Sequence, residues 1–223
     1  MASATHVAAK RTAVLISGRG SNLRALIEAS AKPQASASID LVISNRADAG
    51  GLGHASEAGI ATEVIPHRDF ATQAEFEGAI DRTLTGQHIE LVCLAGFMRV
   101  LSPWFVDRWR DRLLNIHPSL LPAFRGLDTH RRVLETGVRF TGCTVHLVRA
   151  EVDDGPIVIQ AVVPVRPDDH EDSLAARVLE AEHRCYPFAL ELLASGRMRL
   201  ESERVVIDGA KPPEGLLLNP ATS

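Results

Sequence analysis

The sequence has few cysteines, few aromatic residues and no long apolar run, and each shortage excludes a class of protein. Its three cysteines, Cys93, Cys143 and Cys185, lie far apart with no Cys-x-x-Cys spacing. This pattern predicts reduced, buried thiols and no structural zinc site. No apolar stretch reaches the roughly 18 residues that a membrane helix needs, and residues 1–10 lack the apolar segment of a secretory signal. We therefore expect a cytoplasmic protein with no membrane partner.

The sequence also has fewer basic than acidic residues. Lys and Arg number 24 against 28 Asp and Glu, which gives a formal net charge of −4. A dedicated nucleic-acid-binding protein usually has a basic surface and a high pI, so we expect no nucleic-acid partner. A small anionic substrate needs only local positive potential, and the net charge does not exclude one.

Short apolar runs alternate with amphipathic segments in the first half, as is typical of βαβ units on a parallel sheet. Strands are predicted at 13–17, 39–44, 61–65 and 90–95, with helices at 22–30, 51–58 and 71–84. The strands at 61–65 and 90–95 are short and nearly all apolar, so we expect both of their faces to be covered. The second half predicts strands at 113–117, 141–148 and 156–165 and a long helix at 171–194.

The fold class is therefore α/β. A Rossmann-like N-terminal half with a mostly parallel sheet is extended by a C-terminal half that completes a single mixed sheet. We expect residues 1–12 to be a disordered lead, residues 13–208 to form one domain, and residues 209–223 to be a mobile tail.

A glycine-rich loop, Ser17-Gly-Arg-Gly-Ser-Asn22, joins the first predicted strand to the first helix. Its glycines permit a tight turn and close approach to a ligand, and the helix start suits a phosphate. The loop has neither the third glycine of a dinucleotide-binding loop nor the Gly-Lys-Ser/Thr ending of a P-loop. The alternative is an ordinary strand–helix turn in which Ser21 or Asn22 caps the helix.

Polar residues end the predicted strand at 113–117. Asn115 and His117 point to one face because side chains alternate along a strand. An amide can donate to a developing oxyanion, and an imidazole moves a proton near neutral pH; the alternative is that both residues order the following Pro-rich loop. Asp153 and Asp154, before Gly155-Pro156, are either turn residues or carboxylate partners of that imidazole.

Four segments together resemble the phosphoribosylglycinamide formyltransferase family. They are Ser17-Gly-Arg-Gly-Ser-Asn22, Leu94-Ala-Gly-Phe-Met-Arg-Val-Leu101, Leu114-Asn-Ile-His-Pro-Ser-Leu-Leu-Pro122 and Val152-Asp-Asp-Gly-Pro156. The third segment is shared by the wider superfamily that uses 10-formyltetrahydrofolate, and the Gly-Ser-Asn loop points to the purine-pathway member. The resemblance covers roughly residues 14–199.

The resemblance implies a reaction and a set of roles. The formyl group of 10-formyltetrahydrofolate, a co-substrate, would pass to the amine of glycinamide ribonucleotide without a metal. Residues 13–110 would bind phosphate, and residues 111–208 would hold the folate and the catalytic groups. The catalytic residues would be Asn115, His117 and Asp153, the last because it stands two residues ahead of Gly155. The substrate phosphate and ribose would contact Gly20, Ser21, Asn22 and Glu182, and the folate would contact Met98, Arg99, Val100, Leu101 and Asn115.

One position departs from the family pattern. Members commonly have an arginine where this chain has Gln73, and that arginine meets the carboxylate of the folate tail. Gln73 can hydrogen-bond but cannot form a bidentate charged pair, and Arg68 is an alternative partner for the tail. The alternative functions for the protein are those of a formyltetrahydrofolate hydrolase, a methionyl-tRNA formyltransferase and a non-catalytic nucleotide-binding protein. We expect a monomer or a homodimer.

Overall fold

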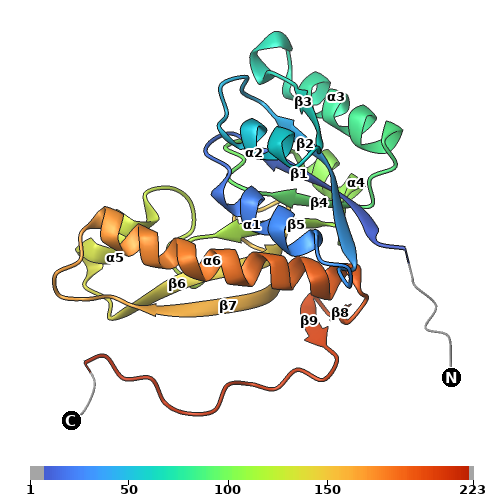
Figure 1. Cartoon of the computed structure of the whole chain (residues 1–223). Coiled ribbons are helices and arrows are strands. Elements are labelled where there is room, and N and C mark those ends of the chain that lie inside the picture. Colours follow the sequence, from blue (N-terminus) through green and yellow to red (C-terminus); the bar gives the residue numbers. More distant parts are fainter. Residues whose placement is uncertain (1–7, 221–223) are drawn as a thin grey trace, which may run out of the picture.

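A seven-stranded mixed sheet runs through the structure in the order β3-β2-β1-β4-β5-β6-β7 (Figure 1). The computed structural model describes residues 8–220, so residues 1–7 of the predicted lead and the last three residues of the predicted tail lie outside the described residues. The strands of this sheet are β1 (Lys10–Ile16), β2 (Ala37–Ser44), β3 (Ala61–Val64), β4 (Leu91–Leu94), β5 (Leu113–His117), β6 (Phe140–Leu147) and β7 (Ile157–Pro164).

Strand direction reverses twice at one end of the sheet, so that only β6 runs against the other six strands. The first five strands pair in parallel, whereas β6 pairs antiparallel with β5 and β7 pairs antiparallel with β6. The register places Asn115 of β5 directly opposite His146 of β6, and His117 opposite Thr144. The predicted α/β class, with a parallel half extended into a single mixed sheet, is confirmed.

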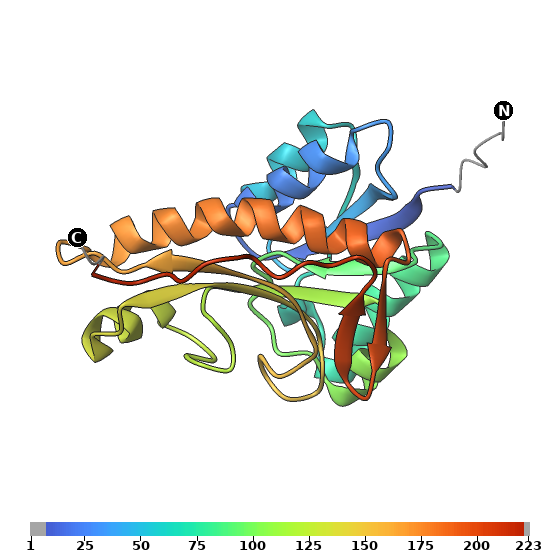
Figure 2. The ribbon, with the colours of Figure 1, turned by 90° about the horizontal axis from the view of Figure 1, so that it is seen from below.

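Helices cover the two faces of the sheet unequally. One face packs against α1 (Ser21–Ser30), α2 (Gly51–Glu57) and the long α6 (Glu171–Ala194), which also contacts α5 (Thr129–Thr136). The other face packs against α3 (Gln73–Gly86) and α4 (Pro103–Arg108), preceded by the short turn η1 (His67–Asp69). Figure 2 shows α6 on one side of the sheet and α3 and α4 on the other. The helix predicted at 171–194 is confirmed with the same bounds.

Three features differ from the expectations. The strand β1 begins at Lys10, so residues 10–12 belong to the sheet and not to a lead. The strand β3 is exposed along its whole length, because it lies at the edge of the sheet and its centre is the polar pair Thr62-Glu63. A hairpin of β8 (Met198–Glu201) and β9 (Arg204–Ile207) follows α6 and was not predicted. Each of its strands has only four residues, too short a run to be assigned from hydrophobic periodicity.

The end of the described chain is attached to the sheet. Residues 209–220 form no helix or strand, yet the side-chain nitrogen of Asn219 donates to the carbonyls of Arg139 and Val165. These two carbonyls lie where β6 begins and just after β7 ends.

A buried tyrosine ties α6 to the strands that carry the polar residues. The hydroxyl of Tyr186 lies 2.9 Å from the carbonyl oxygen of Leu94 and 3.1 Å from that of Leu114, the residue before Asn115. The side chain is fully buried. This contact therefore fixes the ends of β4 and β5 relative to α6.

We expect Tyr186→Phe to lower the free energy of unfolding by about 0.5–1.5 kcal/mol, because the hydrogen bond is lost while the packing is kept. Urea denaturation followed by circular dichroism measures this difference. The control is Phe188→Leu on the exposed side of the same helix, which should stay within about 0.5 kcal/mol of the parent. Equal stability of Tyr186→Phe and the parent protein would contradict the role given to the hydroxyl.

Candidate active site

Asn115, His117 and Asp153 lie together on the sheet face that α3 and α4 cover only in part. Alternation along β5 puts Asn115 and His117 on this face. The turn after β6 folds over them, and Asp153 adopts a left-handed φ of 51° that Asp tolerates better than most residues. Its carboxylate oxygen Oδ2 lies 3.3 Å from Nδ1 of His117. The structure therefore joins three polar groups that are far apart in the sequence.

Both ring nitrogens of His117 face hydrogen-bond acceptors. Its Nε2 donates to the carbonyl oxygen of Phe124 at 2.9 Å, and its Nδ1 faces Asp153. A carbonyl oxygen can only accept, so Nε2 carries a proton here. The imidazole is therefore held between a carbonyl oxygen and a carboxylate, one at each ring nitrogen.

The two neighbouring aspartates have different surroundings. Asp153 is nearly buried and also accepts from the backbone N–H of Gly126 at 2.8 Å. Asp154 instead pairs with Arg125 at the surface, at 2.6 Å, where both side chains are about half exposed. The residue types alone left these two carboxylates as alternatives, the resemblance favoured Asp153, and in the structure Asp153 is the one beside His117. Both contacts attach the segment after His117 to the turn after β6.

A second imidazole contacts the amide of Asn115. Nδ2 of Asn115 lies 3.2 Å from Nε2 of His146, which is buried on β6. Sequence reasoning had no signal for this contact, because it depends on the register of β5 against β6.

The glycine-rich loop closes on itself at the start of α1. Gly20 has a φ of 78°, and a Cβ at this position would lie 2.4 Å from the Cα of Gly51. Both the conformation and the close approach require glycine. No side chain of the described chain caps the N-terminus of α1, and the first turn contains no acidic residue. The first N–H groups of Ser21 and Asn22 are thus available to an anion.

Asn22 connects this loop to the long helix. Its Nδ2 donates to a carboxylate oxygen of Glu182 on α6 at 2.7 Å, and its Oδ1 is buried with no partner among the described residues. Burial raises the pKa of Glu182 to about 6, although the hydrogen bond from Asn22 acts in the opposite direction. A carboxyl group that ionises near neutral pH therefore lies beside the anion-binding end of α1.

The segment 98–101 is held by hydrogen bonds from two sides. The N–H of Met98 donates to Oγ of Ser17 at 2.9 Å, and the carbonyl of Val100 accepts from Nε2 of Gln73, also at 2.9 Å. The side chains of Met98 and Val100 are exposed, whereas Leu101 is buried in the core and presents only its backbone. The same nitrogen of Gln73 also donates to Glu77 at 2.8 Å.

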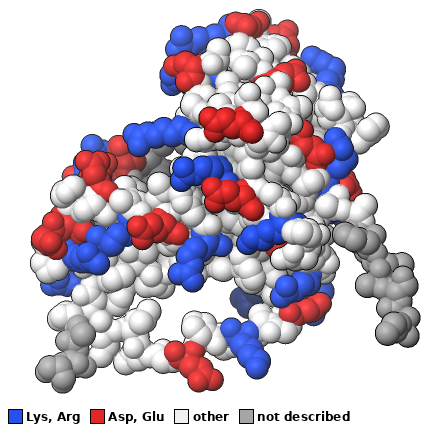
Figure 3. Space-filling model, in the orientation of Figure 1, with Lys and Arg blue, Asp and Glu red and all other residues white. Residues whose placement is uncertain are grey.

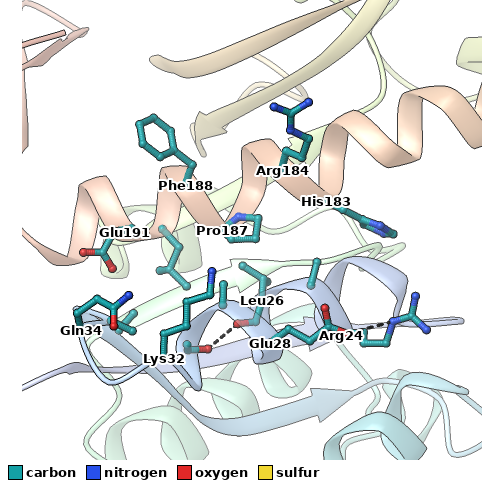
Figure 4. Close-up of a pocket in the computed structure, with 16 residues that line it drawn as sticks. Arg24, Leu26, Glu28, Lys32, Gln34, His183, Arg184, Pro187, Phe188 and Glu191 are labelled. Atoms are coloured by element: carbon teal, nitrogen blue, oxygen red, sulfur yellow. Dashed lines mark hydrogen bonds and ion pairs between the residues drawn. The ribbon is translucent and has the colours of Figure 1, made fainter.

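Two hollows lie outside this cluster. One of about 660 Å³ lies between α1 and α6, where Arg24 and His183 mark one end and Phe188 and Glu191 the other (Figure 4). Another of about 710 Å³ lies between the turn after β6 and the β8–β9 hairpin. Neither is lined by Asn115, His117 or Asp153.

Surface charge, the apolar character of the helices and clusters of metal-binding side chains are relevant to nucleic-acid, membrane and metal binding. Figure 3 shows Lys and Arg interspersed with Asp and Glu on the visible face, without a continuous basic area. Within residues 8–220, no helix combines the length and the apolar character that crossing a bilayer requires. The same part of the chain contains no cluster of three or more His, Cys, Asp or Glu side chains arranged around a metal position.

Fold and site define an α/β enzyme suited to acyl transfer, with an imidazole–carboxylate pair, an amide donor and an uncapped helix start at the same edge of the sheet. The family model described as formyl transferase matches residues 10–190. The chain therefore belongs to the formyl transferase family.

Named relatives agree with this assignment. The chain is 44% identical to phosphoribosylglycinamide formyltransferase of Escherichia coli over 91% of its length and 96% of that protein. It is 53% identical to the trifunctional purine biosynthetic protein adenosine-3 of Homo sapiens over 85% of its length, but spans only 19% of that longer protein. The crystal structure of glycinamide ribonucleotide transformylase 1 from Symbiobacterium toebii superposes with a TM-score of 0.87 at 44% identity, covering 89% of this chain and 94% of that one.

The raised pKa of Glu182 predicts a pH-dependent stability difference. The folded protein holds this proton up to about pH 6, whereas the unfolded chain releases it near 4.5. Stability associated with Glu182 is therefore complete below pH 4.5 and is lost as the pH rises through 6. We expect Glu182→Gln to gain up to about 2 kcal/mol over the parent at pH 8, from 1.36 kcal/mol per pKa unit, and nothing at pH 4. Denaturant unfolding at both pH values measures this, and a gain that is independent of pH would contradict it.

Proposed function

We propose that this protein is a phosphoribosylglycinamide formyltransferase. It transfers the formyl group of 10-formyltetrahydrofolate to the amine of glycinamide ribonucleotide, in de novo purine biosynthesis in the cytoplasm. The observation that carries the proposal is the joining of Asn115, His117 and Asp153 at one point beside the uncapped start of α1. The names of the relatives support the choice of substrates, and three free, buried cysteines support the compartment.

The two substrates approach from opposite ends of the site. The phosphate of glycinamide ribonucleotide binds the N–H groups of Gly20, Ser21 and Asn22, and Glu182 accepts from the ribose hydroxyls. The folate lies against the segment Met98, Arg99, Val100 and Leu101, with backbone groups reading the pterin ring, and beside Asn115. Residues 13–110 thus supply the phosphate site, and residues 111–208 supply the catalytic groups.

The chemistry is direct acyl transfer. The neutral amine attacks the formyl carbon, and the carbonyl oxygen becomes a tetrahedral oxyanion. Asn115 and His117 donate hydrogen bonds to this oxygen, and the loss of one such donor typically lowers the rate by about 10²–10³. Asp153 holds the imidazolium and passes the amine proton, through a water molecule, to the folate nitrogen that carried the formyl group. The reaction uses no covalent enzyme intermediate and no metal.

In the described conformation, Nε2 of His117 is already engaged in a hydrogen bond within the protein. Because Nε2 of His117 donates to the carbonyl of Phe124, it reaches the formyl oxygen only after the segment that follows His117 moves. This segment is attached through Arg125 and Gly126 to the turn that carries Asp153. Substrate binding therefore reorganises the segment and the turn together.

The hydrogen bonds of Gln73 do not suit it to bind the carboxylate of the folate tail. Its Nε2 lies between the carboxylate of Glu77 and the carbonyl of Val100, so both of its N–H groups are used and only an acceptor remains. An acceptor does not attract a carboxylate. Gln73 therefore shapes the folate-binding segment, and Arg68 is the proposed partner of the folate tail.

The decisive experiment follows deformylation of 10-formyltetrahydrofolate with and without glycinamide ribonucleotide. The transferase predicts turnover that depends on the amine and yields formylglycinamide ribonucleotide. Turnover without the amine would instead indicate a formyltetrahydrofolate hydrolase. Absence of turnover, with retained binding of the ribonucleotide, would indicate a non-catalytic binding protein.

We expect His117→Ala and Asp153→Asn each to lower kcat by at least about 10²-fold while KM for both substrates changes little, because both groups act mainly on the developing charge. The matched control is Asp154→Asn, which removes the neighbouring carboxylate at the surface and should keep kcat within about threefold. Steady-state kinetics measures all three. Near-parental turnover in either of the first two variants would refute the assigned roles.

A further inference from the structure

His146 has a defined contact that the proposed reaction does not use. It lies on β6 directly opposite Asn115 of β5, and its side chain is 2% exposed. Two residues directly opposite in an antiparallel pair point to the same face. The imidazole therefore lies behind the catalytic amide, on the protein side of the site.

The hydrogen-bond partners determine the tautomer of this ring. Nδ1 of His146 lies 3.1 Å from the carbonyl oxygen of Leu147. A carbonyl oxygen only accepts, so Nδ1 carries the proton, and Nε2 of the neutral ring has a lone pair. The Asn115 atom at 3.2 Å from Nε2 must then be the donor Nδ2 and not Oδ1.

The surroundings keep this ring neutral. Burial lowers the pKa of His146 and is the largest effect; the bond to Leu147 and the carboxylates of Asp153 and Asp154 act in the opposite direction, and His117 adds to the lowering. Oδ1 of Asp153 is 4.0 Å from Nε2. The neutral ring therefore offers Nε2 as a hydrogen-bond acceptor.

We propose that His146 is a positioning residue that orients the amide of Asn115 for catalysis. One N–H of Nδ2 is donated to His146, which leaves the second N–H for the oxyanion. Without an acceptor at this position the amide is free to rotate by half a turn, and its oxygen would then repel the developing charge. The inference rests on the proposed formyl transfer, because it assigns a role within that reaction.

The test compares two substitutions of similar size. His146→Gln supplies an amide oxygen as acceptor, whereas His146→Met has no comparable acceptor. We expect His146→Met to lower kcat by about 10-fold or more with KM nearly unchanged, and His146→Gln to stay within about threefold of the parent. Equal losses in both variants would overturn the proposal, because a purely structural role depends on packing and not on the acceptor.

A double-mutant cycle removes the effect of general damage. In an Asn115→Ala background the amide is absent, so we expect His146→Met to cause no further loss of kcat. An additional loss of the same size as in the parent would show that His146 acts independently of Asn115 and would overturn the proposal. Thermal unfolding of each variant confirms that folded proteins are compared.

A measurement on the unmodified protein needs no variant and no activity. Nitrogen NMR of protein with ¹⁵N-labelled histidine should show the Nδ1–H tautomer of His146, with Nε2 unprotonated, throughout pH 6–8. An Nε2–H tautomer or an imidazolium would overturn the proposal, even if His146→Met does not fold. The wild-type assay with and without glycinamide ribonucleotide tests the proposed function separately, so the two failures are distinguishable.

Discussion

The antiparallel pairing of β5 with β6 is the constraint on which the site depends. A sixth parallel strand would require a crossover, and the chain would then leave β5 without returning across its polar face. Because β6 instead runs back along β5, His146 lies opposite Asn115. The turn after β6 can then fold over the same face and bring Asp153 to His117. The reversal at β6 thus brings Asn115 into contact with His146, 31 residues away, and His117 into contact with Asp153, 36 residues away.

The long helix α6 connects this chemistry to the anion-binding loop. Tyr186 holds the carbonyls of β4 and β5, and one turn earlier Glu182 accepts from Asn22 at the start of α1. The spacing of four residues puts both side chains on one side of the helix. The relative position of the two substrates in the proposed reaction is therefore set by a single helix.

Much of this arrangement follows from the sequence, and the remainder depends on contacts at long range. Hydrophobic periodicity predicts the strand of Asn115 and His117 and the bounds of α6. It does not reveal the β8–β9 hairpin, whose strands have only four residues each, or the exposure of the edge strand β3. The residue types alone leave Asp153 and Asp154 as alternatives, whereas the motif resemblance favours Asp153, the one that contacts His117. The contact with His146 depends on strand register, which no motif indicates.

The same face holds two imidazoles with different hydrogen-bond neighbours. His117 has an acceptor at each ring nitrogen, a carbonyl oxygen and a carboxylate. His146 has an acceptor at one nitrogen and a donor at the other, so a second proton would oppose the N–H of Asn115. Asp153 lies near both rings, and its charge alone does not distinguish them. The distinction comes from the neighbouring hydrogen-bond groups, which in the proposed reaction suit His117 to donate to the substrate and His146 to orient the amide of Asn115.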